Sequence, residues 1–293
     1  MSHRTTLTVS MASMALLALC VAACGDNQTP APPRGEYQAT EPLPLPCVPN
    51  LDGKIDANEL VPQLGIPATY LVNPAGKNRP VDTVGVTNKS GQLTWSFATD
   101  YADDQALTIS ASSLEGKWYA SSFQGLSSPF VTPVDSGGTT EGVYTRDDQG
   151  FYLHGVASAK ENPPEGKTLF VYTSKVALYK FPIAPGASWT STGEVKSGTL
   201  RGLPYAERDT YEVKVDGADQ LTLPDFTLTQ ALRVRTLVSI SPAAGQPTTQ
   251  RQVSFLFECL GEVTRATSKL NEPNENFTDA SELRRLGLAP VSN

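Results

Sequence analysis

The chain has 293 residues, of which 39% are hydrophobic and 18% charged, with 23 glycines and 23 prolines. This is the composition of a globular protein, and its length suffices for one large β domain or two small ones with a sizeable core. The formal net charge of −7 makes phosphate backbones poor partners, which argues against nucleic-acid binding.

The chain begins with a stretch that has the layout of an export signal. Arg4 gives it a positive charge, and a mainly apolar run follows from Leu7 to Ala23. Hydroxyl side chains interrupt this run, which is too short to span a hydrocarbon core of about 30 Å comfortably. The pattern therefore predicts a signal peptide over residues 1–23.

The run ends in Val21-Ala22-Ala23-Cys24, which resembles the lipobox of bacterial lipoproteins. In that family small residues precede the cut, and the cysteine thiol carries diacylglycerol and becomes the new N-terminus. The resemblance covers the residues up to Cys24 and implies that Cys24 is lipidated, although Val21 stands where leucine is usual. The alternatives are an uncleaved membrane helix and an ordinary signal peptide in which Cys24 is not modified.

Lipidation makes the membrane the first expected partner of this chain. Two or more acyl chains hold a protein stably on a bilayer, whereas one chain binds only marginally. Gly25 follows Cys24, so the aspartate that marks inner-membrane retention in enteric bacteria is absent at that position. The resemblance therefore implies a cell-envelope protein that is lipid-anchored through Cys24 to the outer membrane, on its periplasmic or surface face.

Residues 24–46 are rich in proline and show almost no apolar periodicity. Such a segment predicts an extended, semi-rigid linker of about 3 Å per residue, which can hold a domain several nanometres from the bilayer. Cys47 follows the linker and forms, with Cys259, an even pair in an oxidising compartment. The sequence therefore predicts a disulfide between them, and the alternative is two buried free thiols.

The stretch after the linker carries a helix signal and a weak metal signal. Asp56 followed by Glu59 fits a capping box, so a short helix is predicted over residues 57–64. Oxygen side chains also stand at the spacing of an EF-hand loop, at Asn50, Asp52, Asp56 and Glu59. The first ligand position holds Val48, which supplies no oxygen. We therefore expect no calcium site and no cofactor, and interpret these residues as a turn and a helix cap.

From about Tyr70 onward, apolar and polar residues alternate with a period of two, which predicts half-buried antiparallel strands. The clearest alternations lie at 93–97, 211–215, 232–240 and 253–257. Turn residues predict hairpins at Asp147 to Gly150 and at Pro224-Asp225. The predicted fold class is therefore mostly β, an antiparallel β domain over residues 47–270.

Two predicted strands are unusually long, over 189–200 and 205–215, and can pair around 201–204. Long, twisted strands that bury one face curl into a half barrel or stack as a sandwich, and the spacing does not choose between these. The stretch 160–167 either separates two sub-sheets or forms one surface loop.

The alternation stops after Ser268. Asp279 and Glu282 form a second capping box, so a short helix is predicted from about Ala280 to Leu286 within a C-terminal tail over 271–293. Four arginines, two in a strand and two in this tail, are interpreted as edge or surface charges that discourage aggregation, namely Arg233, Arg235, Arg284 and Arg285.

Catalytic signatures are largely missing from the sequence. G-x-S-x-G, H-E-x-x-H, C-x-x-C and a glycine-rich phosphate loop do not occur. His154 is the only histidine after the predicted signal peptide, and such a strand residue is more often a satisfied polar side chain than a base. A glycosidase pair could lie among the loop carboxylates Asp100, Asp103, Asp104, Asp147 and Asp148, but their spacing singles out no two of them.

These observations predict a non-catalytic function. The expected protein is an exported, lipid-anchored envelope protein that acts as a binding or structural module, with an unknown protein or an apolar ligand as its partner. One alternative is a lipid or lipoprotein carrier, because a curved sheet can hold acyl chains on its concave face; the fold would then resemble the half barrels of lipoprotein-sorting proteins. The other alternative is a cell-envelope hydrolase that uses loop carboxylates.

Overall fold

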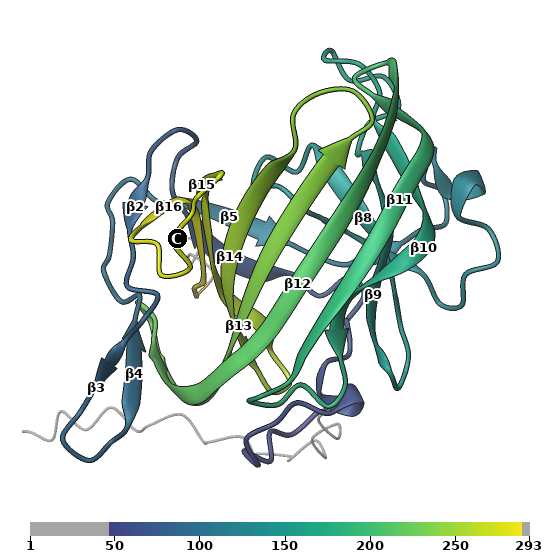
Figure 1. Cartoon of the computed structure of the whole chain (residues 1–293). Coiled ribbons are helices and arrows are strands. Elements are labelled where there is room, and N and C mark those ends of the chain that lie inside the picture. The colour runs from purple at the N-terminus through teal and green to yellow at the C-terminus, as the bar shows by residue number, and fades with distance from the viewer. Residues whose placement is uncertain (1–46, 289–293) are drawn as a thin grey trace, which may run out of the picture. The chain divides into compact units, whose positions relative to one another are not determined.

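The computed structural model describes residues 47–288. The predicted signal peptide, the linker and Cys24 lie outside the described residues. The described chain is mostly β, as the alternation predicts: sixteen strands form one sheet, and the helices among these residues are two short 3₁₀ turns (Figure 1). No helix in this part of the chain is long and apolar enough to cross a membrane.

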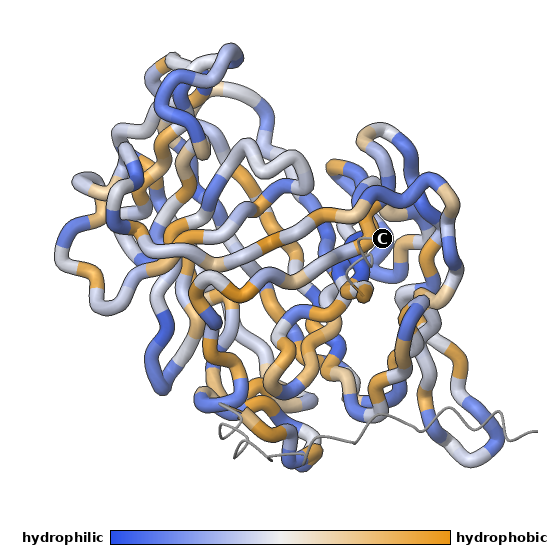
Figure 2. The backbone as a smooth tube through the Cα atoms, turned by 180° about the vertical axis from the view of Figure 1, so that it is seen from behind, coloured by the Kyte–Doolittle hydropathy of each residue, from blue (hydrophilic) through white to orange (hydrophobic). Residues whose placement is uncertain are grey.

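Short elements come first in the chain, namely η1 (Ala57–Glu59), β1 (Ala68–Val72), β2 (Arg79–Pro80), β3 (Val86–Thr87), β4 (Leu93–Ser96), β5 (Gln105–Ile109), β6 (Ser112–Ser113), η2 (Ala120–Phe123) and β7 (Phe130–Pro133). Longer strands follow, namely β8 (Thr140–Arg146), β9 (Gly150–Ser158), β10 (Leu169–Lys180), β11 (Ser188–Leu200), β12 (Leu203–Thr222), β13 (Thr227–Pro242), β14 (Thr248–Phe257), β15 (Gly261–Leu270) and β16 (Asp279–Leu286). Hydrophobic and hydrophilic residues alternate along these strands in Figure 2, as expected where one face is buried.

The strand order shows how the sheet curls. From β6 to β16 each strand pairs with the next in an antiparallel meander, and the order continues from β16 to β1 and β5. The two edges of this row, β5 and β6, are separated by only two residues in the chain, yet they do not pair. The sheet therefore curls back on itself without closing, and it is one sheet rather than a sandwich. The stretch 160–167 is a loop between the paired strands β9 and β10.

The long strands β11, β12 and β13 pair over most of their length and form the front wall in Figure 1. Their hairpins lie where the sequence predicts them, at 201–202 and 223–226, and so does the β8–β9 hairpin at 147–149. In the second of these turns the N–H of Leu223 donates to the carbonyl of Phe226 at 2.9 Å. Long strands accumulate twist, which bends the sheet toward a barrel-like curl.

Cross-strand register defines two faces of the sheet, because directly opposite residues share a face. The inner face carries the successive partners Val234, Ser254, Arg265 and Arg284. The outer face carries their chain neighbours Arg233, Phe255, Thr264 and Arg285.

Two segments cover parts of the outer face. The chain between β2 and β5 covers β13 to β16, where the rings of Trp95 and Phe97 lie 5.0 and 5.4 Å from Phe255. Gly217 permits this close approach, since a Cβ atom there would lie 3.0 Å from the Trp95 ring. On β7 to β9, the turn η2 provides the cover through Phe123.

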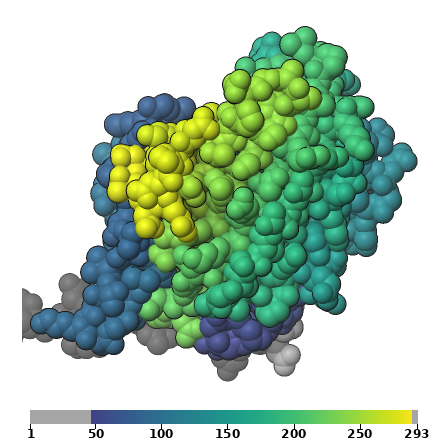
Figure 3. Space-filling model, viewed as in Figure 1, coloured from purple at the N-terminus to yellow at the C-terminus, as the bar shows by residue number. Residues whose placement is uncertain are grey.

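Residues 47–66 pack across one end of the curl, at the bottom of Figures 1 and 3. Ile55 and Ile183 exchange two backbone hydrogen bonds of 2.9 Å. Both side chains are buried in one core cluster with Leu232 and Leu256 of the inner face. The N-terminal segment therefore belongs to the same folded unit as the sheet.

The two predicted helices differ from the structure. In place of a helix over 57–64 only the 3₁₀ turn η1 forms, because Pro62 disfavours α conformation in the residue before it. The predicted helix from Ala280 to Leu286 is wrong: these residues form β16, which pairs with β15 on one side and β1 on the other. Two ladders of backbone hydrogen bonds outweigh the local capping signal, so the sheet continues into the predicted tail over 271–293.

Candidate ligand-binding cavity

A cavity of about 890 Å³ lies inside the curl. One wall comes from β7 to β10 and the other from β1, β15 and β16, while residues 60–67 line it as well. Small-molecule sites occupy about 300–1,000 Å³, so this volume suits a ligand. Two smaller depressions, of about 350 and 440 Å³, are lined mainly by polar and charged side chains. We therefore take the large cavity as the candidate site.

The wall formed by β7 to β10 is aromatic, and we call Phe130, Tyr144, Phe151 and Tyr179 the aromatic wall. Phe130 stacks on Tyr144 with ring centroids 5.6 Å apart. Phe151 lies 5.4 Å from Tyr144 and 6.0 Å from Tyr179. Cross-strand register brings these rings together, because Phe130 is the partner of Tyr144 and Phe151 that of Tyr179. The result is a continuous apolar surface that faces the cavity.

The facing wall carries charge. Arg265 and Arg284, which we call the arginine pair, are cross-strand partners that line the cavity together with Glu262. The guanidinium of Arg265 lies 3.6 Å from Glu262 and 3.8 Å from Glu282, too far for hydrogen bonds. Arg284 donates one hydrogen bond of 3.1 Å to Glu282. The Nε atoms of both arginines are buried and have no partner among the described residues.

The titration of the arginine pair shows where positive charge is least neutralised. Burial lowers the pKa of Arg284, and the neighbouring Arg265 guanidinium lowers it further. Burial also acts to lower the pKa of Arg265, but Glu262 and Glu282 raise it, and the net change is upward. Both groups stay charged at physiological pH. Burial and the like charge of Arg265 thus act on Arg284 in the same direction, although Arg284 makes the one hydrogen bond that the pair has to a carboxylate among the described residues.

Neighbouring hydroxyl groups hold Glu262 in place. The hydroxyl of Ser254 donates to the Glu262 carboxylate at 2.8 Å, and that of Tyr70 donates to the Glu262 backbone carbonyl at 2.8 Å. Burial raises the pKa values of Tyr70 and Tyr144 to about 12. Both tyrosines therefore remain protonated, and each hydroxyl can donate a hydrogen bond.

A second polar cluster lies on β12. The hydroxyl of Tyr172 donates to Asp209 at 2.5 Å, and that of Tyr205 donates to Glu207 at 2.8 Å. Both carboxyl groups are buried. Burial, and then the nearby Asp209, raises the pKa of Glu207 to about 7, and burial also raises the pKa of Asp209. At neutral pH Glu207 is therefore protonated in part, whereas an ordinary glutamate has lost its proton.

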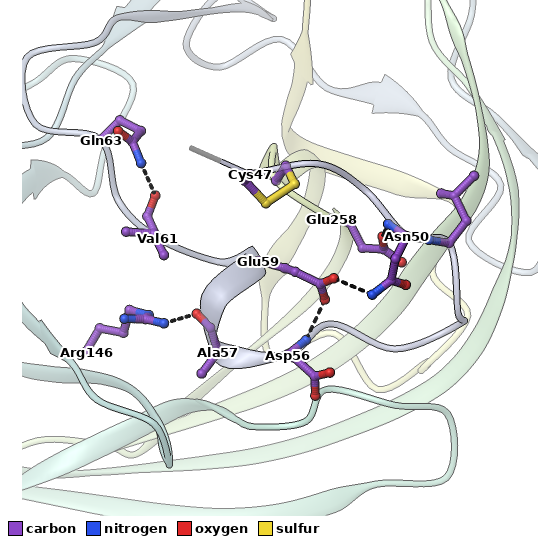
Figure 4. The surroundings of a disulfide bond; sticks show 11 residues. Cys47, Asn50, Asp56, Ala57, Glu59, Val61, Gln63, Arg146 and Glu258 are labelled. Carbon is purple, nitrogen blue, oxygen red and sulfur yellow. Dashed lines mark hydrogen bonds between the residues drawn. A yellow bond between two sulfur atoms is a disulfide. The ribbon is translucent and has the colours of Figure 1, made fainter. Parts of the chain in front are cut away.

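Of the residues at EF-hand spacing, Figure 4 shows Glu59 hydrogen-bonded to Asn50 and to the backbone of Asp56. The carboxylate of Glu59 accepts the Asn50 side-chain N–H at 2.7 Å and the backbone N–H of Asp56 at 2.8 Å. Asp56 itself pairs with Lys54 at 2.5 Å, and Asp52 lies 3.5 Å from the same lysine. Over residues 47–288 no group of three or more His, Cys, Asp or Glu is arranged to hold a metal ion. Glu59 therefore acts as part of a cap.

The predicted disulfide between Cys47 and Cys259 is present, with Cα atoms 5.5 Å apart (Figure 4). The buried carboxylate of Glu258 strengthens this junction, since it accepts the backbone N–H groups of Asn50 and Leu51 at 2.6 and 2.8 Å. Cys259 itself lines the cavity. The disulfide thus fixes the N-terminal segment beside the cavity.

The loop aspartates of the hydrolase alternative make structural contacts. Asp104 is buried and binds the guanidinium groups of Arg79, at 2.7 Å, and Arg285. Asp103 binds Arg79 at 2.8 Å. Asp147 accepts two backbone N–H groups of its own turn, at 2.8 and 3.0 Å. The remaining two are exposed, namely Asp100 and Asp148.

His154 lies outside the cavity lining. Its Nε2 shares a hydrogen bond of 2.8 Å with the Thr145 hydroxyl. Burial lowers the pKa of His154, and the nearby Lys175 lowers it further. The side chain is thus a partnered strand residue in the described structure.

The four arginines interpreted as surface charges are buried, so that interpretation is wrong. Arg233 and Arg235 both bind Asp216, at 2.7 and 2.8 Å, beneath the segment that covers the outer face. Arg284 and Arg285 point to opposite faces because consecutive strand residues alternate. The sequence gives no local signal for the roles of Arg233, Arg235 and Arg285, since the carboxylate partner of each comes from another segment.

The fold and the site together define a class of protein: an open, curled antiparallel sheet that encloses a partly apolar cavity with one charged wall. Comparisons with protein-family models, with curated proteins and with solved structures each gave no match. The function is therefore argued from the cavity itself.

Proposed function

We propose that this chain is an exported, lipid-anchored envelope protein that binds an apolar ligand inside its curled sheet and performs no chemistry of its own. The cavity of about 890 Å³ is the observation that carries the proposal. It has at least twice the volume of either of the two smaller depressions. Its lining gains van der Waals contacts when a ligand fills it.

The lining supports an apolar occupant. Besides the aromatic wall, it includes aliphatic and aromatic side chains of the N-terminal segment, of β5, of β13 with the turn before it, and of β16, namely Ile66, Ile109, Phe226, Leu228 and Leu286. Burying apolar surface of a ligand against these groups contributes about 25 cal/mol per Å². The carrier alternative therefore receives more support from the cavity than a purely structural role does.

The proposed anchor supplies the location. A lipidated Cys24 tethers the domain to the outer membrane, where acyl chains are abundant, and the extended linker predicted over residues 24–46 spans the distance to the bilayer. The loop carboxylates considered for a hydrolase are exposed or already bound to arginines and backbone N–H groups. Both points favour binding over catalysis.

Mass spectrometry of the native protein tests this proposal. The lipoprotein is extracted from membranes, washed, and its bound small molecules are identified. Ala68→Trp fills the cavity, because Ala68 lines it from β1. Ala106→Trp is the matched control: Ala106 is exposed on the neighbouring strand β5, and its register partner Leu71 points away from the side that carries Ala68.

The wild type and Ala106→Trp should carry the same apolar molecule, and Ala68→Trp should have lost most of it. Thermal melting of each variant checks that the fold is intact. Equal ligand content in all three proteins, or none in any of them, would overturn the proposed function.

A further inference from the structure

The arginine pair is unusual because two like charges stand directly opposite each other on a buried wall. Arg265 and Arg284 are register partners on β15 and β16, and Arg284 is only 4% exposed. Like charges directly opposite across strands are destabilising, and desolvation adds to that cost. Something must offset both effects if the pair is to be favourable.

Carboxylates of the chain offset them only in part. Arg265 makes no hydrogen bond within the described residues, because its two nearest carboxylate atoms lie 3.6 and 3.8 Å away. The second oxygen of Glu262 is occupied by Ser254. Each guanidinium has five N–H donors, so most donors of the pair are free to bind another acceptor.

The net charge of the residues that line the cavity is positive. The charged residues that line it are two arginines and one glutamate, Arg265, Arg284 and Glu262. Planar guanidinium groups match the geometry of carboxylate and phosphate groups, and such bonds are stronger than neutral ones. The cavity wall is therefore suited to an anion rather than to a neutral or cationic group.

The aromatic wall faces this charge. Tyr144 and Tyr179 line the same cavity as Arg265 and Arg284, so the two walls border one space. An apolar surface opposite two arginines whose guanidinium donors are only partly paired matches a molecule that has both an apolar body and an anionic end. Neither wall alone would select such a molecule.

We propose that the occupant of the cavity is an anionic amphiphile, whose carboxylate or phosphate head binds between Arg265 and Arg284 and whose acyl chain lies along the aromatic wall. This inference rests on the proposed function, because it names the class of the ligand that the cavity holds. The arginine pair is then the group that selects ligands with an anionic head over neutral or cationic ones.

Photo-crosslinking of the full-length lipoprotein in phosphatidylcholine vesicles tests the inference. Four probes share one photoreactive hexadecyl chain and differ in the head, which is a carboxylate, a phosphate, an alcohol or an amine. Labelling of cavity peptides is read by mass spectrometry. The variants are Arg265→Gln and Arg284→Gln, with Arg265→Lys as the conservative change. Arg208→Gln is the matched control, since Arg208 is 63% exposed.

The anionic probes should label the cavity about tenfold or more above the alcohol, the effect expected of one or two charge-assisted hydrogen bonds. Each glutamine variant should reduce this labelling to the level of the alcohol, while Arg208→Gln changes nothing and Arg265→Lys keeps part of the preference. The stronger of the two anionic probes identifies the source as a fatty acid or a phosphate lipid. If Arg284→Gln does not fold, the more accessible Arg265→Gln decides.

The experiment distinguishes a failure of the arginine-pair inference from a failure of the proposed function. Equal labelling by all heads, preference for the amine, or unchanged preference in the glutamine variants would overturn the role of the arginine pair and leave the proposed function standing. Labelling of cavity peptides by none of the four probes would overturn the proposed function, and this inference with it.

Discussion

Replacing Asp104 by asparagine should destabilise the folded protein strongly. The Asp104 side chain is 4% exposed and binds Arg79 and Arg285, whose side chains are 4% and 0% exposed. Asparagine keeps the shape of the side chain but removes its charge. Arg79 would still have Asp103, whereas Arg285 would lose its carboxylate partner. An uncompensated buried charge of this kind costs about 3–5 kcal/mol of unfolding free energy.

An exposed ion pair provides the matched control. Arg208 binds Glu194 at 2.5 Å, with side chains that are 63% and 34% exposed. Glu194→Gln removes this charge in the same way as the substitution of Asp104. Because solvent screens an exposed pair, its loss should cost about 0–1 kcal/mol. The difference between the two substitutions therefore isolates the contribution of burial.

Urea unfolding of residues 46–293 measures both effects. The described residues 47–288 form one compact unit that contains the core clusters, so this segment holds what the sheet needs to fold. A shift of the urea midpoint at an unchanged slope of unfolding free energy against urea concentration reports a change in stability. A cost below about 1 kcal/mol for Asp104→Asn would refute the reasoning, because the buried and exposed pairs would then be equivalent.

Three further predictions concern other parts of the chain. The pKa of Glu207 is about 7 in the folded state against 4.5 ordinarily, so the folded protein binds this proton more tightly and loses stability as pH rises from 4.5 to 7. Glu207→Gln should be about 1–3 kcal/mol more stable than the wild type above that window, and urea midpoints should converge below it. Cys47→Ser should lower unfolding free energy by about 2–4 kcal/mol and abolish the mobility difference between reducing and non-reducing gels. Cys24→Ala should abolish labelling by radioactive fatty acid, and continued labelling would contradict the proposed anchor.

Local pattern predicts the strands whose two faces meet different surroundings. The alternations at 232–240 and 253–257 lie in β13 and β14. Each has a period of two because alternate side chains of these strands point to the outer face, under the covering segment, and to the inner face of the curl. The hairpins could also be predicted, because the conformational preferences of turn residues act over only a few positions of the chain. The residues of β16 follow a helix signal instead, and only pairing with β15 and β1 decides their conformation.

The cavity lies beyond what local pattern can predict. Its volume depends on how far the sheet curls, and the arginine pair forms only when β15 and β16 pair in one register. The disulfide could be predicted because two cysteines remain after the predicted anchor, and the export signal predicts an oxidising compartment in which such a pair is oxidised. Asp216 beneath the covering segment could not be assigned to Arg233 and Arg235, since a sequence does not show which charged residues become buried together.

Arg284 and Arg285 are adjacent residues that illustrate two different uses of a buried arginine. Arg285 donates to the carbonyls of Phe97 and Thr99 and to Asp104, so the chain itself offsets its desolvation. Arg284 has one hydrogen bond and a like charge opposite it. On stability alone, an apolar residue would serve better at that position. The arginine makes physical sense if a bound anion completes its hydrogen bonds, in which case the group that weakens the empty protein is the one that holds the ligand.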